Sequence, residues 1–327
     1  MQKEIRKPTY IIAEAGINHN SDIKIAKKMI EVSAKCGANA IKFQTFTPDE
    51  LFSELINPKL YHLSQNWVLS KKDHIELQNH ARKNKIDFFS TPCGIKSANL
   101  LKNLKVPFMK IASGEITNID LIDYISKMQI PMIISTGMTS ISEISKVVEI
   151  VRSNNCKFVL LHCVSSYPTN FKDANLATIS YLQKTFDVPI GFSDHTVGID
   201  VSLAAVALGA TIIEKHFTLD KNMDGPDQKL SIDPNELSNL VKKTRMIEKA
   251  IGQHRTHVFT TEKQFRDNMR KSLGVSQTIP SNTILKRSMI TSFRPGTGIP
   301  PSMINNFVGR KTKKSIKKGS LLDWDYF

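Results

Sequence analysis

Eight short apolar runs, each closed by polar or reactive side chains, dominate the first two thirds of the chain. Each run is rich in Ile, Val and Phe, which is typical of strands buried on both faces. The intervals between runs are long enough for a helix, so the pattern predicts an α/β fold built as a (β/α)8 barrel, with its chemistry at the carboxyl ends of the strands. The runs are TYIIAEAG, AIKFQTF, DFFSTP, FMKIAS, PMIISTG, FVLLHC, PIGFSD and TIIEKHF, between Thr9 and Phe217.

The interval after the first run has the features of a helix that leads into the next strand. Ser21 and Asp22 offer N-cap oxygens, and Gly37 is a plausible C-cap just before AIKFQTF. VSLAAVALGA ends in the same way at Gly209 before TIIEKHF, so helix and strand alternate as a barrel requires. In the first helix, residues at helical spacing are Ala26, Met29, Ile30 and Ser33.

The pattern changes after LSNLVKKTRMIEKAIG. Residues 253–271 are polar and weakly periodic, which predicts a linker with a single helical turn. Beyond it lie three extended pieces, LGVSQTI, TILKRSMI and NFVGRKTKKSI, bounded by the turn-like PSN, RPGTGIPP and KKG. We expect a barrel domain over 1–255, a linker over 256–271 and a small β-rich domain over 272–327. A domain this small has a thin core, so it should pack on the barrel or on a partner chain.

The composition is that of an ordinary globular protein, with 40% hydrophobic and 23% charged residues. No apolar run approaches the ~20 residues that a membrane span requires, and no apolar signal region precedes the first strand. The cysteines show no CxxC spacing, which favours free thiols in a reducing compartment. We therefore expect a cytoplasmic protein with no membrane partner. The four cysteines are Cys36, Cys93, Cys156 and Cys163.

The net charge of +15 is concentrated near the C-terminus, where residues 261–327 hold 13 Lys and Arg against 4 Asp and Glu. A basic segment fits a solvated surface, attraction of an anionic substrate, or nucleic acid. The stretch RKTKKSIKKG has no aromatic residue on which bases could stack. A solvated surface is therefore the first interpretation, and we expect no nucleic-acid partner.

His195 in SDHT and His216 in EKHF form the strongest metal signal. Each histidine lies at the end of a predicted strand, and in an eight-stranded barrel the seventh and eighth strands are neighbours. Two imidazoles there could hold a divalent metal and leave positions open for water or substrate. The alternative is that each histidine merely caps a loop.

Lys42 and Lys110 lie within apolar runs, where an unpaired ammonium group is costly to bury. A structural ion pair would explain them. Two lysines facing one barrel mouth, among hydroxyl groups, better suit a small dianion such as a phosphate or carboxylate compound. No Walker-type or GxGxxG loop is present, so we expect no nucleotide cofactor. The hydroxyl groups are those of Thr91, Ser113, Ser135 and Ser193.

Carboxylates complete the candidate chemistry. Glu14 ends the first strand and Glu115 follows the fourth, where each could act as a general acid or base or could neutralise the lysines. Asp224 and Asp227, in DGPD, could contact substrate hydroxyls, or could simply stabilise a turn.

Many of these segments together resemble a known family, the sialic acid (N-acetylneuraminate) synthases. FRPGTGIPP resembles that family's C-terminal antifreeze-like (SAF) domain, and the resemblance covers nearly the whole chain. It implies a TIM-barrel enzyme that condenses phosphoenolpyruvate with an N-acetylmannosamine-type sugar and water, giving a nonulosonic acid and phosphate. The other matching segments, in chain order, are IAEAGINHN, AIKFQTF, STP, KIASGE, STGM, LLHCVSSYPT, GFSDHT, AAVALGA, EKHFTLD and GPD.

The resemblance also implies roles for single residues. A divalent metal, Mn²⁺ or Mg²⁺, would lie on His195 and His216. Glu14 matches a carboxylate that assists proton transfer. Glu14 and Lys110 are the implied catalytic residues. Arg294 matches an arginine that reaches the active site of the other subunit in a domain-swapped homodimer. The implied phosphoenolpyruvate-binding residues are Lys42, Thr91, Lys110, Ser113, Ser135, Ser165 and Ser193, and the sugar-binding residues are Gln44, Glu115, Tyr167, Asp227 and Arg294.

Three alternatives stay open. KIASGE and SSYPT favour a neuraminate or legionaminate synthase over a pseudaminate synthase, but legionaminate and pseudaminate synthases, which use a 2,4-diacetamido-trideoxy hexose, share most motifs. A related phosphoenolpyruvate-dependent synthase acting on a sugar phosphate would have no need of the SAF-like segment. A non-enzymatic protein that binds nucleic acid or carbohydrate through its basic C-terminal segment is the third alternative.

Overall fold

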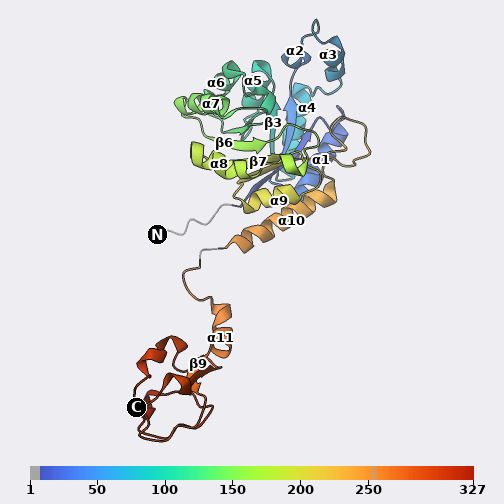
Figure 1. Ribbon diagram of the computed structural model, residues 1–327. Helices are drawn as coiled ribbons and strands as arrows, with labels where there is room; N and C mark the ends of the chain where they lie inside the picture. Colours follow the sequence, from blue (N-terminus) through green and yellow to red (C-terminus); the bar gives the residue numbers. More distant parts are fainter. Residues whose placement is uncertain (1–7, 253–254) are drawn as a thin grey trace. The chain divides into compact units, whose positions relative to one another are not determined.

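The computed structural model describes residues 8–252 and 255–327, which belong to two compact units, the first ending at Gly252 (Figure 1). The first unit is a closed barrel of eight parallel strands in sequential order, with β1 paired to β8. This confirms the predicted (β/α)8 barrel, and each of the eight apolar runs contains one strand. The strands are β1 (Tyr10–Gly16), β2 (Ala40–Thr45), β3 (Asp87–Pro92), β4 (Met109–Ile111), β5 (Met132–Ser135), β6 (Phe158–Cys163), β7 (Ile190–Asp194) and β8 (Ile212–His216).

Helices connect the strands and cover the outside of the barrel (Figure 1). Their inner faces and the strands share one apolar core, in which Phe43, Phe89 and Phe192 are almost completely buried. The helices of this unit are α1 (Ile23–Lys35), α2 (Pro48–Leu51), α3 (Pro58–Gln65), α4 (Lys71–Lys83), α5 (Ile95–Asn103), α6 (Ile119–Ser126), α7 (Ile141–Ser153), α8 (Ala177–Phe186), α9 (Asp200–Ala207) and α10 (Pro234–Ile251).

Helix α1 forms as its sequence predicts. The Asp22 carboxylate accepts a hydrogen bond of 2.7 Å from the backbone N–H of Lys24, which makes it the N-cap. Just after the C-terminal end of α1, Gly37 adopts a φ of +84°, a conformation that other residues rarely adopt. The face between these ends packs on the barrel through the four positions expected from the spacing: Ala26, Met29, Ile30 and Ser33.

The alternation of side chains along each strand determines which residues face the interior of the barrel. On β7 and β8, Ser193, Glu214 and His216 line an interior cavity. The intervening Asp194 points to the helix layer instead, where it accepts a hydrogen bond from Ser202 of α9. Lys215 pairs with Asp194 on the same outer face.

The second unit contains a two-stranded antiparallel sheet, β9 (Ser272–Val275) and β10 (Ile290–Phe293), in which Val275 lies opposite Ile290. Single bridges join Ile279 to Ile316 and Ile284 to Lys311. The small core of this unit contains the buried side chains of Leu273, Val275, Ile279, Leu285, Phe307 and Ile316.

Two local predictions for this unit were wrong. Helix α11 (Thr260–Met269) spans ten residues where the sequence suggested a single turn. None of its side chains is buried within the described chain, and most of its residues are polar, so the sequence gives few apolar positions from which to predict a helix. The piece TILKRSMI contains only a bridge at Ile284 and a 3₁₀ turn at Arg287–Met289, and the second strand begins where that piece ends, at Ile290.

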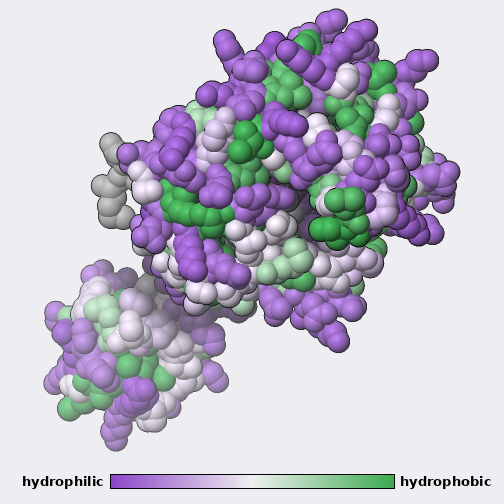
Figure 2. Space-filling model, turned by 90° about the horizontal axis from the view of Figure 1, so that it is seen from above, coloured by the Kyte–Doolittle hydropathy of each residue, from purple (hydrophilic) through white to green (hydrophobic). Residues whose placement is uncertain are grey.

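No helix in the described ranges is both long and apolar enough to cross a membrane. Hydrophilic residues cover most of the face seen in Figure 2, and the apolar residues on it form separate patches. All four cysteines are free thiols, as their spacing predicts.

Candidate active site

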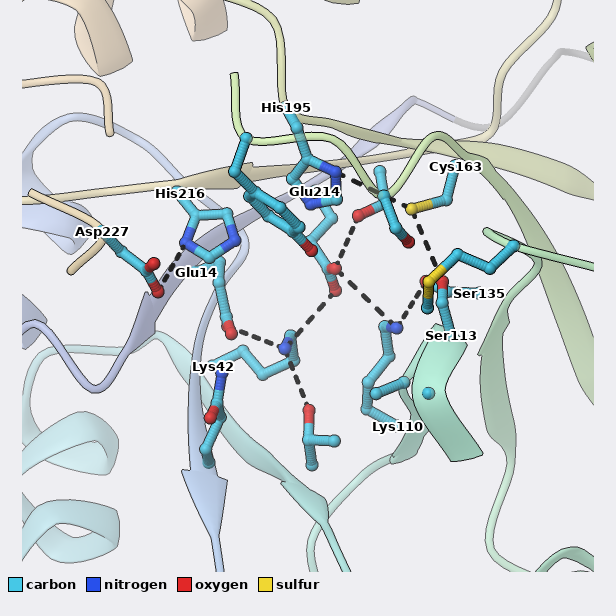
Figure 3. Close-up of a pocket in the computed structure, with 18 of the residues that line it drawn as sticks. Glu14, Lys42, Lys110, Ser113, Ser135, Cys163, His195, Glu214, His216 and Asp227 are labelled. Atoms are coloured by element: carbon cyan, nitrogen blue, oxygen red, sulfur yellow. Dashed lines mark hydrogen bonds and ion pairs between the residues drawn. The ribbon is translucent and has the colours of Figure 1, made fainter. Parts of the chain in front are cut away.

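A cavity of about 400 Å³ opens at the carboxyl ends of the barrel strands (Figure 3). Every one of the eight strands, or the segment directly after it, contributes at least one lining residue. Thirteen of the fifteen residues predicted for the site line this cavity: Glu14, Lys42, Gln44, Thr91, Lys110, Ser113, Ser135, Ser165, Tyr167, Ser193, His195, His216 and Asp227.

The other two predicted residues, Glu115 and Arg294, are not among its lining. Glu115 lies in a 3₁₀ turn after β4 and accepts a hydrogen bond of 2.9 Å from Asn118. Arg294 belongs to the second unit, where its Nε donates to the carbonyl oxygen of Met269 at 3.0 Å. A resemblance in sequence could not distinguish these two from residues that face the cavity.

Lys42 is held between β1 and β3. Its Nζ lies 2.8 Å from Glu14 Oε2 and donates a 3.0 Å hydrogen bond to Thr91 Oγ1. Glu14 and Lys42 are direct neighbours in the register of β1 and β2, so barrel pairing alone brings them together. Both side chains are buried, and the predicted lysine is therefore an ion-paired cation inside the barrel.

Lys110 is the second buried lysine of the cavity. Its Nζ donates to Ser135 Oγ at 2.6 Å and to the carbonyl oxygen of Ile111 at 3.0 Å. Its nearest carboxylate is that of Glu214, at 3.8 Å. Lys110 thus has a longer and weaker ion pair than Lys42.

Glu214 is the main residue of the site that the sequence analysis missed. It lies 3.8 Å from each of Lys42 and Lys110 and accepts a 2.9 Å hydrogen bond from Ser193 (Figure 3). The signal was present, because a residue two positions before an inward-facing His216 on a strand must also face inward. The other missed lining residues include Cys93, Met138 and Cys163.

Burial and mutual attraction shift the pKa values of this cluster. Burial raises the pKa of Glu14, and the nearby Lys42 only partly offsets the effect. Burial alone would raise the pKa of Glu214 too, but Lys110 and Lys42 outweigh it and hold that pKa low. Burial lowers the pKa of Lys110, despite the attraction of Glu214. The site therefore contains one carboxylate that stays charged and one that readily takes a proton.

The two histidines lie side by side, with ring centroids 5.4 Å apart. His195 Nδ1 is 2.8 Å from the carbonyl oxygen of Val164, and His216 Nδ1 faces Asp227 Oδ2 at 3.6 Å. The acceptor beside His195 Nδ1 fixes the proton there and leaves Nε2 of that ring as the free ligand atom, an arrangement common around metals. Burial, followed by the neighbouring His195, lowers the pKa of His216 to about 3, so it stays neutral at ordinary pH.

The histidine pair alone does not make a complete protein ligand set. Within residues 8–252 and 255–327, no group of three or more His, Cys, Asp or Glu side chains has the arrangement of a metal site. The buried Nδ1 of His216 also has no hydrogen-bond partner in the described chain. The donors fit a metal whose remaining positions are filled by water or substrate.

A hydroxyl group and a thiol line the side of the cavity near β5 and β6. Ser113 Oγ accepts a 2.9 Å hydrogen bond from the backbone N–H of Gly137 and lies 3.6 Å from Cys163 Sγ. A Cβ atom at Gly137 would lie 2.7 Å from Ser113 Oγ and even closer to Ser165 Oγ, so a larger residue there would force these hydroxyl groups to move. Ser165 Oγ is buried without a hydrogen-bond partner among the described residues. This side of the cavity offers polar capacity to a ligand.

The chain matches known proteins over nearly its whole length. Residues 29–256 match the NeuB family, and residues 270–327 match the SAF domain. The chain is 40% identical to the N,N'-diacetyllegionaminic acid synthase of Campylobacter jejuni, covering 97% of this chain and 99% of that protein. It is 36% identical to the human N-acetylneuraminate-9-phosphate synthase, over 95% of this chain and 90% of the relative.

Solved structures agree with these relatives. The crystal structure of N-acetylneuraminic acid synthetase from Leptospira borgpetersenii, in complex with citrate, superposes with a TM-score of 0.77 at 40% identity. It covers 81% of this chain and 94% of that one. From the family match and these relatives, the chain belongs to the NeuB family and carries a C-terminal SAF domain.

Proposed function

We propose that this protein is a nonulosonic acid synthase, which condenses phosphoenolpyruvate with an N-acetylmannosamine-type sugar and water to give a nine-carbon 2-keto acid and phosphate. The observation that carries the proposal is the pair Lys42 and Lys110, which share Glu214 in one buried cavity. A buried cation pair with hydroxyl groups around it suits an anion that bears both phosphate and carboxylate. The synthase relatives support the same reaction class.

The lysines would bind phosphoenolpyruvate. Lys42 and Lys110, with Thr91, Ser113 and Ser135, can donate hydrogen bonds to its phosphate and carboxylate oxygens. Ser165 and Ser193 complete the proposed phosphoenolpyruvate site. Because the lysines act inside a buried cavity, their charge stabilises the phosphate oxygens more strongly than it would in water.

The reaction forms one carbon–carbon bond and replaces the carbon–oxygen bond to phosphate with one to the oxygen of water. The enol carbon of phosphoenolpyruvate attacks the aldehyde carbon of the open-chain sugar, and the former aldehyde oxygen takes up a proton and becomes a hydroxyl group. Water adds at the carbon that bears the phosphate, and cleavage of the phosphate C–O bond then releases phosphate and leaves the ketone. We assign the proton of the attacking water to the Glu14 carboxylate, whose pKa burial raises toward the range of a useful base. Lys110 would stabilise the charge that develops on the departing phosphate.

A divalent metal, Mn²⁺ or Mg²⁺, fits the two histidines. His195 and His216 would hold it, and the Nδ1 of His195 already has an acceptor in the carbonyl oxygen of Val164. Such an ion would supply Lewis acidity to a bound aldehyde oxygen.

The sugar site is proposed on the other side of the cavity. Gln44, Tyr167 and Asp227 line it there, and the Tyr167 ring lies 4.2 Å from that of His195. We propose that Glu115 adds a contact from the β4 turn. A second copy of the chain would supply Arg294 in a domain-swapped homodimer. Phosphoenolpyruvate and an N-acylated amino sugar are then the partners, in a protein that we propose is cytoplasmic.

Phosphate release is the direct test. Purified protein with Mn²⁺ and phosphoenolpyruvate should release phosphate only when an amino sugar is added. Comparing kcat/KM for N-acetylmannosamine and its 2,4-diacetamido-2,4,6-trideoxy analogue identifies the sugar, and a preference for the second would make the protein a legionaminate-type synthase, as the Campylobacter relative is named.

No release with any amino sugar would refute the proposal. Release with a sugar phosphate alone would instead indicate a synthase that acts on sugar phosphates. Salt-sensitive DNA binding without turnover would indicate a non-enzymatic protein that binds nucleic acid.

A further inference from the structure

The loop that follows β8 carries Asp227, and its two ends are held together. The backbone N–H of Thr218 donates to the carbonyl oxygen of Ile232 at 3.0 Å. The backbone N–H of Ile232 donates to the carbonyl oxygen of His216 at 2.8 Å. Residues 219–231 therefore form a loop with a closed neck beside the cavity. Most of its side chains up to Asp227 are exposed or only half-buried, so apolar packing does little to fix its shape.

Gln228, the neighbour of Asp227, is completely buried and uses its whole amide group. Its Nε2 donates to the carbonyl oxygen of Asn18 at 3.0 Å and to that of Asp224 at 3.4 Å. Its Oε1 accepts a hydrogen bond from the hydroxyl group of Thr218. A single side chain thus links the loop to its own neck and to the segment after β1.

Asn18 makes the complementary connection from the β1 side. It is 1% exposed, and its Nδ2 donates to the carbonyl oxygen of Phe217 and to Ser231 Oγ, both at 2.9 Å. The hydroxyl group of Ser231 in turn donates to the carbonyl oxygen of Asp227 at 2.6 Å. This chain of hydrogen bonds ends on the backbone of the residue whose carboxylate faces the cavity.

Neither Asn18 nor Gln228 is among the described residues that line the cavity, so neither can touch a substrate there. We infer that they are positioning residues, which hold Asp227 on the sugar side of the site. The inference rests on the proposed function and deepens it. Because Lys42 and Lys110 are held by β2 and β4, loss of the network should weaken sugar binding and leave phosphoenolpyruvate binding intact.

The test compares two buried glutamines. Gln228→Met keeps the size of the side chain and removes its hydrogen bonds. Gln78→Met is the matched control, because Gln78 is 8% exposed, lies on α4 and donates a 2.7 Å hydrogen bond to the carbonyl oxygen of Leu104. In the phosphate-release assay, Gln228→Met should raise the KM for the sugar at least tenfold and change that for phosphoenolpyruvate less than twofold. Gln78→Met should change neither KM more than twofold.

Hydrogen–deuterium exchange provides a readout that is independent of turnover. Gln228→Met should speed exchange in residues 219–227 at least tenfold, and Gln78→Met should not. If Gln228→Met fails to fold, Thr218→Val replaces it, because it removes only the hydroxyl group that donates to Gln228. Thr218→Val should raise the KM for the sugar at least threefold and leave that for phosphoenolpyruvate nearly unchanged. Equal changes in both KM values, no change in either, or unaltered exchange in the loop would overturn the inference. Lack of turnover by the unmodified protein would instead refute the proposed function.

Discussion

Two buried ion clusters lie on opposite faces of β7 and β8, and they differ in how completely their charges are compensated. On the outer face, Lys215 Nζ lies 3.0 Å from Asp194 Oδ2. Asp194 also accepts hydrogen bonds of 2.8 Å from the backbone and hydroxyl group of Thr196, and one of 2.5 Å from Ser202. Each oxygen of this carboxylate therefore has two donors.

The inner cluster is less complete. Glu214 lies 3.8 Å from each of the two lysines, and its Oε2 has no hydrogen-bond partner among the described residues. A buried charge is costly unless its partners satisfy it. The outer pair meets that requirement within the protein, as a structural pair must. The inner cluster borders a cavity, and each of its two lysines makes two short contacts among the described residues, which leaves one of three N–H donors for an anionic ligand. Unused hydrogen-bonding capacity beside a cavity, rather than burial of charge alone, therefore indicates a binding site.

Breaking the outer pair of Asp194 and Lys215 should have the largest effect, and this effect should be a loss of stability. Lys215→Met leaves Asp194 charged and unpaired, so the free energy of unfolding should fall by about 3–5 kcal/mol. Chemical denaturation measures it. The double variant Asp194→Leu with Lys215→Met should recover part of the loss, because no unpaired charge remains. A double variant as unstable as the single one would contradict a structural pair.

Removing an inner cation should act on catalysis instead. Lys110→Met should lower kcat/KM for phosphoenolpyruvate by about 10²–10³-fold, since one donor to a developing charge is lost. The free energy of unfolding should fall by less than in Lys215→Met, because the ion pair of Lys110 is long, its own burial costs free energy and Glu214 keeps Lys42 as a partner. Steady-state kinetics and denaturation of the same sample measure both. If Lys110→Met lost much of its stability and kept normal kinetics, the inner cluster would be a structural one, like the outer pair.

Glu14→Gln should lower kcat by about 10²-fold, because the proton acceptor for water is lost, and leave both KM values nearly unchanged. Burial raises the pKa of Glu14 to about 7, and a base must be ionised, so kcat of the unmodified enzyme should rise with pH through this range. The variant should lack that rise. Near-normal turnover by Glu14→Gln with intact substrate binding would remove this role.

His19 is a buried titratable group that, like the outer pair, does not line the cavity, so its effect should be on stability. Burial lowers its pKa in the folded protein to about 4, below the unfolded value of 6.5. As pH falls below 6.5, the unfolded chain binds the proton first, so the folded state should lose about 2 kcal/mol between pH 7 and pH 5. Denaturation at both values should show this, and His19→Gln should reduce the difference. An unchanged difference would mean that other groups cause it.

The sequence predicted most of the barrel because strand burial and helix capping are local signals. All eight apolar runs contain strands, and Asp22 caps α1 as its position suggests. Helix α11 was underestimated because most of its residues are polar and none of its side chains is buried, so its local signal is weak. Arg294 came from resemblance alone, as did the sugar-contact role of Glu115, and both roles stay predictions.

The alternation of side chains along each strand follows from the sequence alone. It places Glu214 and His216 on one face of their strand and Lys215 on the other. Which residues of different strands meet depends on the tertiary structure. Closure of β1 on β8 sets Glu14 opposite His216, 202 positions apart, and beside Lys42. Gln228 reaches Asn18 across 210 positions. Such contacts depend on barrel register and loop path, which arise from the packing of the whole chain and have no local signature.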